Sequence, residues 1–164
     1  MPVHPSDVLS AARTIRGGAL RTPVLRSAWL DAAAAHPVHC KAEHLQHTGS
    51  FKFRGALNAL SLLARSGGAS AGVVCHSTGN HAAALAAAAA YERIPCAVVM
   101  PHDTPSFKVA HAAAFGARVD LCEPTQAARR ERRVGFFLTT AGLCVLVPLC
   151  RTLCFHVFPF GTPM

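Results

Sequence analysis

Two short segments of the chain combine residue types that could carry out amine and proton-transfer chemistry. The first, SFKFRGA (50–56), places Lys52 between two phenylalanines at the start of an expected helix. The second, HSTGNHA (76–82), presents hydroxyls, an amide and imidazoles at the end of an expected strand. Lysine is scarce, with three residues against thirteen arginines, so a lysine in this setting needs an explanation.

Lys52 is expected to lie in the first turn of a helix over 50–65, with Ser50 as its N-cap. The partial positive charge of the helix N-terminus and the apolar walls of Phe51 and Phe53 both favour the neutral form of the amine. A neutral amine is a nucleophile that forms Schiff bases with carbonyl compounds. The alternative is an ordinary solvated lysine on an amphipathic helix.

The second segment is predicted to be a strand-to-helix turn. Residues 71–76 are predicted to form a buried strand, and the alanine-rich stretch from Asn80 predicts a helix. The turn Ser77-Thr78-Gly79 therefore follows the carboxyl end of a strand, where open α/β sheets bind ligands. Its hydroxyls, the Asn80 amide and the free N–H groups of the helix start suit an anion. The alternative is that these hydroxyls only cap the helix.

The elements that would position both segments alternate between strand and helix, which predicts a parallel α/β sheet with flanking helices. Strands are predicted at 37–42, 71–76, 95–100 and 118–122, and helices at 6–17, 50–65, 80–91 and 105–115. Thr104 is predicted to cap the last helix, with Pro105 at its first position. Residues 66–68 (Ser-Gly-Gly) predict a linker.

Together, SFKFRGA and S-x-G-N-H at this distance resemble the fold-type II pyridoxal-phosphate enzymes, in the branch of serine racemases and serine/threonine dehydratases. The resemblance also runs through TPVLRSAWL, KAEHLQHTGSFKFRGALNAL, IPCAVVMP and FGARVDLCEP, over roughly residues 5–133. It implies the N-terminal half of a tryptophan synthase β-like fold. Residues 1–68 would begin the large cofactor domain, 69–133 would form an incomplete small α/β domain, and 134–164 would be an unrelated apolar tail.

The resemblance implies a role for each matched residue. Lys52 would bind pyridoxal 5'-phosphate covalently and act as the base on one face of the substrate, with Phe51 beside it. Asn80 would hydrogen-bond the ring hydroxyl of the cofactor. Ser77, Asn80 and His81 would hold the substrate carboxylate.

Thr78 matches the residue that serves the racemases as the acid/base on the opposite face. Racemisation needs proton donors on both faces of a planar carbanion, and the threonine keeps the hydroxyl that this requires. The implied function is interconversion of L- and D-serine, with serine/threonine ammonia-lyase activity as a side reaction. A serine/threonine dehydratase is the alternative.

Further properties follow from the resemblance and from composition. Ser27 and Thr48 match nucleotide-contacting positions, so ATP and Mg are implied as effectors, although no metal site is predicted within the chain. The family implies a homodimer. The net charge of +8 does not favour nucleic acid, because the arginines are scattered and no aromatic residues alternate with them. Without a signal-peptide pattern, and with cysteines in no framework spacing, the default location is the cytoplasm.

The composition changes after residue 133. From Val134 onward the chain carries one formal charge, Arg151, and no Asp, Glu or Lys. This tail is interpreted as a non-homologous end, as a membrane segment at 134–150 behind the basic ARRERR (128–133), or as a buried apolar segment. No glycine-rich phosphate loop is found, so a truncated chain of weak or no activity is expected. The alternative is a non-catalytic form that binds or modulates a full-length copy.

Overall fold

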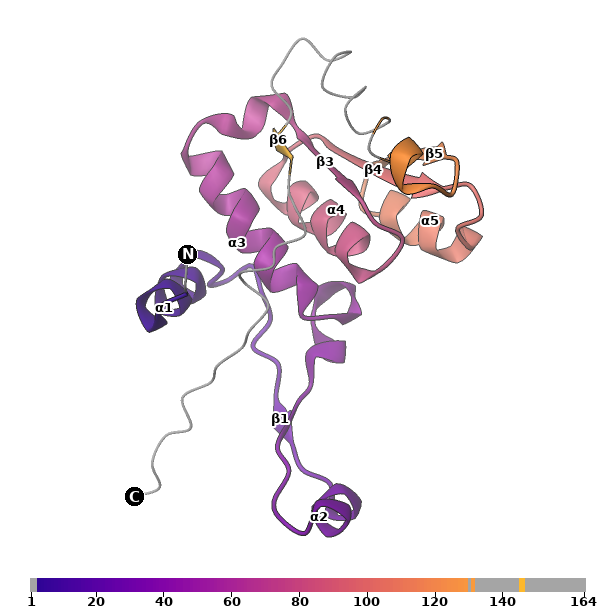
Figure 1. Cartoon of the computed structure of the whole chain (residues 1–164). Coiled ribbons are helices and arrows are strands. Elements are labelled where there is room, and N and C mark those ends of the chain that lie inside the picture. Colours follow the sequence, from indigo (N-terminus) through magenta and orange to yellow (C-terminus); the bar gives the residue numbers. More distant parts are fainter. Residues whose placement is uncertain (1–2, 130, 132–144, 147–164) are drawn as a thin grey trace.

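A parallel sheet forms the centre of the protein (Figure 1). The computed structural model describes residues 3–129, 131 and 145–146 of the 164. The sheet has the strand order β5-β4-β3-β6, formed by β3 (Val73–His76), β4 (Cys96–Pro101), β5 (Arg118–Cys122) and β6 (Val145–Leu146). The predicted parallel α/β architecture is confirmed.

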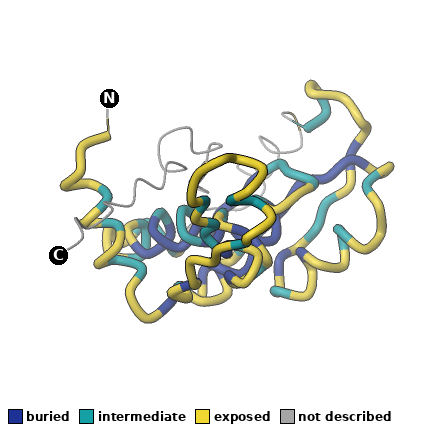
Figure 2. Tube along the Cα trace, turned by 90° about the horizontal axis from the view of Figure 1, so that it is seen from below, coloured by how far each residue is buried: buried dark blue, intermediate teal, exposed yellow. Residues whose placement is uncertain are grey.

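Three helices accompany the sheet: α3 (Lys52–Arg65), α4 (Asn80–Glu92) and α5 (Ser106–Ala113). Helix α4 contacts β3 and β4 and packs against α3. Every residue from Ala82 to Ala89 is buried (Figure 2, dark blue). Because alanine ends at Cβ, α4 can approach both the sheet and α3 closely. Figure 1 shows α3 and α4 running in the same direction, with their N-termini at the same end.

The segment before α3 consists of short helices and strands, and few of its residues are buried. It comprises α1 (Pro5–Thr14), β1 (Val24–Leu25), α2 (Ala28–Ala34), β2 (Cys40–Lys41) and the 3-10 helices Glu43–Leu45 and His47–Gly49. Strands β1 and β2 pair antiparallel, and the strand expected over 37–42 is only two residues long. A further 3-10 helix, Gly68–Ala71, follows α3 where the linker was predicted.

Two predicted helix caps were wrong. Helix α3 begins at Lys52, with Phe51 rather than Ser50 at the N-cap position. The Ser50 hydroxyl does not cap it; that hydroxyl is buried and has no hydrogen-bond partner among the described residues. Helix α5 has Pro105 as its N-cap, and the Thr104 hydroxyl is likewise buried without a partner.

The remaining predictions on domains and the tail are not tested. In the part of the chain that the structure describes, no helix combines the length and apolarity needed to cross a bilayer. The tail 134–164, including the segment 134–150 considered as a membrane span, lies outside the described residues except for β6. The division into a large-domain part (1–68) and a small domain (69–133) stays a prediction.

Candidate functional site

Lys52 is the first residue of α3, and its side chain is half-buried. Phe53, which follows it, is 3% exposed and belongs to the main apolar core, so the start of the helix is anchored. The Lys52 Nζ atom lies 5.0 Å from the centroid of the Phe51 ring. The aromatic neighbour that the sequence predicted beside this amine is therefore in place.

The turn after β3 presents polar groups at the start of α4. Ser77 and Thr78 are half-buried, and Asn80 is exposed. Gly79 is the N-cap of α4 and makes no side-chain cap bond; its N–H donates instead to Ser77 Oγ at 3.3 Å. Neither the Ser77 nor the Thr78 hydroxyl caps α4, so the alternative that these hydroxyls serve only as helix caps was wrong.

The pKa of His81, in the second segment, is affected by a charge in the first segment. Its pKa is lowered chiefly by burial, and then by the positive charges of Lys52 and His76. Helices α3 and α4 pack against each other and start at the same end of the molecule, so the first residue of α3 and the second residue of α4 lie at that end (Figure 1). The lowered pKa means that His81 stays neutral to a lower pH than an ordinary histidine.

This proximity predicts that replacing Lys52 by methionine raises the pKa of His81 toward its ordinary value, because the mutation removes one of the charges that disfavour the imidazolium. The measurement is an NMR titration of the histidine ring protons. Lys108→Met is the control, because Lys108 lies in α5 and is not among the charges that lower the pKa of His81. An unchanged His81 titration in Lys52→Met would show that the amine does not lie beside the turn.

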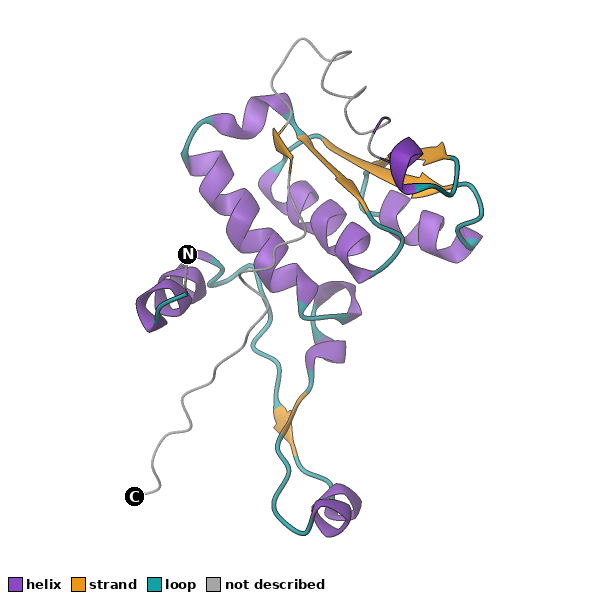
Figure 3. Cartoon of the chain, viewed as in Figure 1, coloured by secondary structure: helices purple, strands orange, loops and turns teal. Residues whose placement is uncertain are grey.

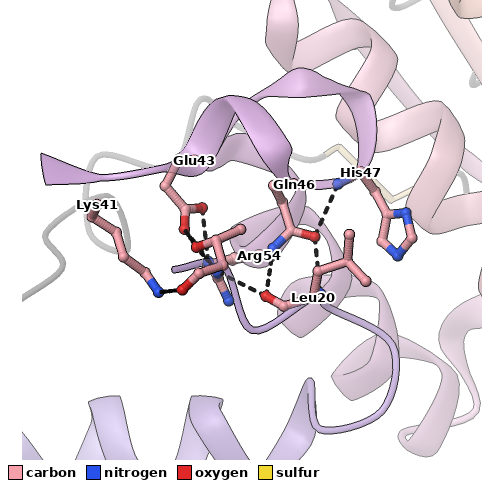
Figure 4. A network of polar contacts seen from close by, with 7 residues as sticks. Leu20, Lys41, Glu43, Gln46, His47 and Arg54 are labelled. Carbon is pink, nitrogen blue, oxygen red and sulfur yellow. Dashed lines mark hydrogen bonds and ion pairs between the residues drawn. The ribbon is translucent and has the colours of Figure 1, made fainter. Parts of the chain in front are cut away.

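A network of polar contacts holds the segment that leads into Lys52 (Figure 4). Arg54 donates two hydrogen bonds to Glu43, from Nη2 to Oε1 at 2.7 Å and from Nε to Oε2 at 2.8 Å. The Thr22 hydroxyl also donates to Glu43, and Lys41 donates to the Thr22 carbonyl. Both charged side chains of the Glu43–Arg54 pair are 15% exposed, so the pair is well shielded from water.

Gln46 extends the network to Leu20, which precedes β1 in the chain. Its amide donates to the Leu20 carbonyl at 2.9 Å, and its Oε1 accepts from the Leu20 and His47 N–H groups at 3.0 Å each. Gln46 is 4% exposed. These bonds fix the 3-10 helix His47–Gly49, which contacts α4. The network thus sets the position from which α3, and with it Lys52, begins.

The sequence did not identify this network. Apart from the bond between the adjacent residues Gln46 and His47, its partners are 11 to 34 residues apart along the chain, and local patterns carry no information on such pairs. One signal was present: Glu43, Gln46 and Arg54 are polar residues in stretches that must pack beside a core, and buried polar groups need partners.

We expect Arg54→Gln to lower the free energy of unfolding by about 2 kcal/mol or more, because it leaves the Glu43 carboxylate without its bidentate partner. The matched control is Arg26→Gln, which removes the ion pair of Arg26 with Asp31. Arg26 is 52% exposed, so its loss should cost at most about 1 kcal/mol. Urea unfolding of both variants measures the difference, and equal losses would contradict the assigned role of the network.

Two hydroxyls near Lys52 are buried without partners among the described residues, Thr48 Oγ1 and Ser50 Oγ. Thr48 also has a left-handed backbone (φ 63°), which is costly for a β-branched residue. Thr48 was predicted, with Ser27, to contact a nucleotide. The structure places them in different elements: Ser27 precedes α2, and Thr48 lies in the 3-10 helix beside α4.

A hollow in the described part of the molecule lies away from this site. Its volume is about 430 Å³, and it lies where the end of α1 meets the C-terminal ends of α3 and α4, lined by Ser61, Tyr91 and Glu92 among others. Lys52 and the 77–81 turn lie at the opposite ends of α3 and α4. The described residues contain no group of three His, Cys, Asp or Glu side chains that could hold a metal.

The sequence is similar to one known protein family and to several of its members. Residues 15–142 match the model of a family described as pyridoxal-phosphate dependent enzyme. The chain is 50% identical over 113 residues to an L-threo-3-hydroxyaspartate ammonia-lyase of Pseudomonas sp, covering 69% of this chain and 35% of the relative. It is 41% identical over 123 residues to the serine racemase of Dictyostelium discoideum, covering 75% and 38%.

A solved structure agrees with these sequence matches. The maize serine racemase superposes with a TM-score of 0.85 at 31% identity, covering 93% of this chain and 45% of that one. The chain therefore spans less than half of the length of the relatives that it matches.

Proposed function

The chain belongs to the family of pyridoxal-phosphate-dependent enzymes, and we propose that Lys52 and the 77–81 turn form one side of a cofactor site for racemisation or ammonia elimination of hydroxy amino acids such as serine and threonine. The observation that carries the proposal is that α3 and α4 pack against each other with their N-termini at the same end, which brings the start of α3 and the 77–81 turn to one end of the molecule. It supports an amine that faces the turn across a space between two helix starts.

The residues present suit one end of the cofactor. Lys52 offers a primary amine for the aldehyde group, and the half-buried position beside Phe51 limits competition from water. Asn80, exposed at the start of α4, offers an amide to the ring hydroxyl. The buried, unpartnered hydroxyls of Thr48 and Ser50 are further groups for which a ligand or water could provide a partner. The phosphate needs groups beyond these, so we expect weak affinity.

The turn would hold and orient the substrate. Ser77, Asn80 and His81 would bind its carboxylate, with the neutral imidazole of His81 able to donate one hydrogen bond. The free N–H groups and the dipole of the α4 N-terminus favour the same negative charge.

Lys52 and Thr78 would move the proton. When bound, pyridoxal phosphate supplies an electron sink for negative charge at the substrate Cα. The Lys52 amine would take the Cα proton from one face, and the Thr78 hydroxyl would deliver a proton to the other face in racemisation. In elimination the proton taken up by Lys52 would pass to the β-hydroxyl, which would leave as water, and hydrolysis of the unsaturated product would release ammonia and pyruvate. One proton abstraction thus leads to either product.

The test is to titrate the purified chain with pyridoxal phosphate, to follow the visible absorption of the lysine-bound cofactor, and then to assay L-serine for D-serine and pyruvate. We expect a saturable band at high cofactor concentration, with weak turnover. A chain that gives neither band nor product at saturating cofactor would contradict the proposal.

The short span of the chain favours a second candidate, a non-catalytic protein that binds or modulates a full-length copy. It predicts that the chain changes the turnover of a full-length relative without turnover of its own. Mixing the chain with the Dictyostelium racemase and measuring D-serine formation separates the two candidates.

The finer properties inferred from the sequence remain part of this proposal. They are nucleotide contacts through Ser27 and Thr48, activation by ATP and Mg, a homodimeric assembly and a cytoplasmic location. The domain assignment of residues 1–68 and 69–133 belongs with them.

A further inference from the structure

The hollow at the C-terminal ends of α3 and α4 is lined by charged side chains that the proposed cofactor site does not use. Helix α1 contacts α3, and α3 packs against α4 (Figures 1 and 3). The last residues of these three helices, Thr14, Arg65 and Glu92, all line the hollow. Its volume of about 430 Å³ lies within the usual range of small-molecule sites.

Glu92 gives one side of the hollow a negative charge. The hydroxyl of Ser61, which is 5% exposed, donates to Glu92 Oε1 and so ties the carboxylate of α4 to α3. Glu92 is half-buried, and no cation among the described residues forms an ion pair with it. The C-terminal ends of the three helices add partial negative charge. This side of the hollow therefore suits an ammonium group.

Two arginines give the hollow positive charge as well. Arg16 follows α1 and Arg65 ends α3, and both are exposed. Neither guanidinium forms an ion pair with Glu92 or with any other carboxylate in the part of the chain that the structure describes. Guanidinium groups bind carboxylates through paired hydrogen bonds. Opposite charges that line one hollow without pairing leave room for a ligand that carries both charges.

Tyr91 forms a wall of the hollow, and Gly18 holds it there. A Cβ atom added at Gly18 would lie 2.7 Å from Leu57 Cδ2 and 3.0 Å from Tyr91 Cζ, so any side chain at this position would displace the Tyr91 ring. The Tyr91 hydroxyl thus lies over the backbone at Gly18, where it can donate or accept a hydrogen bond.

We propose that this hollow binds a free α-amino acid, with the ammonium group at Glu92 and the carboxylate at Arg16 and Arg65. A simple anion would leave Glu92 unpaired, and a simple cation would leave the arginines unpaired. Lys52 and the 77–81 turn lie at the other ends of α3 and α4, so this ligand would not contact the groups proposed to react. The inference does not rest on the cofactor site.

The test uses the only tyrosine and the only tryptophan of the chain, Tyr91 and Trp29. The chain is labelled with fluorotyrosine and fluorotryptophan and titrated with L-alanine, without pyridoxal phosphate, while fluorine NMR is recorded. The Tyr91 signal should shift saturably, and the Trp29 signal, from α2, should stay unchanged. Ethylamine and propionate each carry one of the two charges of L-alanine and should bind ~10-fold more weakly or less.

Variants assign the binding to the charges of the hollow. Glu92→Gln keeps an acceptor for Ser61 and removes the charge, and it should lower the affinity for L-alanine by ~10-fold or more, as should Arg16→Gln. The matched control is Arg13→Gln, because Arg13 is exposed in the last turn of α1 and does not line the hollow. Lys52→Ala should also leave the affinity unchanged, which distinguishes failure of this inference from failure of the cofactor proposal.

Four results would overturn the inference. The first is a Tyr91 signal that does not shift with L-alanine, and the second is a shift that Glu92→Gln and Arg16→Gln both leave intact. The third is propionate or ethylamine binding as tightly as L-alanine, which would indicate a site for a single charge. The fourth is loss of the shift in Lys52→Ala, which would place the amino acid at the other end of α3.

Discussion

Replacing Lys52 by alanine is expected to abolish the visible absorption band that forms when the chain is mixed with pyridoxal phosphate. The band reports a covalent bond between the cofactor aldehyde and a lysine amine, and Lys52 is the lysine at the start of α3, the helix that packs against α4. The measurement is an absorption spectrum at saturating cofactor, with circular dichroism to establish that the variant is folded. Because Lys52 starts α3 and its side chain is only half-buried, we expect little loss of stability.

Lys108→Ala is the matched control for this experiment. Lys108 also lies in the first turn of a helix beside a phenylalanine, with its Nζ 5.9 Å from the Phe107 ring centroid. It therefore shares the local chemistry of Lys52 but not the position beside the turn. The control should keep the full band. A band that survives Lys52→Ala and disappears in Lys108→Ala would remove Lys52 from the site.

Replacing Thr78 by alanine is expected to separate the two proposed reactions. Racemisation needs the hydroxyl on the face opposite Lys52, so D-serine formation should fall by ~100-fold or more. Elimination needs only the first proton abstraction, so pyruvate formation should persist. The measurement is the ratio of D-serine to pyruvate formed from L-serine by the chain with saturating pyridoxal phosphate.

Thr78→Ser is the control for the hydroxyl itself. It keeps the proton donor and removes only the methyl group, so the ratio of D-serine to pyruvate should stay close to that of the unmodified chain. The assigned role fails if alanine and serine at this position give the same ratio, or if alanine lowers both products equally. The second outcome would identify Thr78 as a residue that only shapes the turn, since its hydroxyl would then matter to both reactions alike.

Much of the fold could be predicted from the sequence, because its central elements are specified locally. The strands Val73–His76 and Cys96–Pro101 are short apolar runs, and the alanines of α4 have high helix propensity. Alternation of the two then requires parallel pairing with crossovers. The observed sheet follows this pattern in the order β5-β4-β3.

The parts that local patterns could not give depend on tertiary contacts. Ser50 is a residue type favoured at N-caps, but the N-cap position lies one residue later, and the Ser50 hydroxyl is buried without a cap bond. The Glu43–Arg54 pair joins residues 11 apart, and nothing in either neighbourhood specifies the other. The solvent exposure of residues 23–41 could not be predicted either, because the exposure of a side chain depends on which distant segments pack against it.

Only part of the candidate site could be predicted from the sequence. The residue types and their order around Lys52 and Ser77 to His81 indicated the chemistry. Their convergence is a property of the fold: it depends on α3 and α4 starting at the same end of the molecule, which is seen only in three dimensions. The role of each residue in binding and proton transfer stays a prediction.

The most direct test of the central claim is to identify which lysine carries the cofactor. Borohydride reduction of the chain with pyridoxal phosphate fixes the label, and peptide mass spectrometry then locates it among three lysines. Lys41 is a stringent competitor, since burial and the charge of Arg54 lower its pKa. The account predicts the pyridoxyl group on Lys52. A label found mainly on Lys41 or Lys108, or spread evenly over all three, would contradict it.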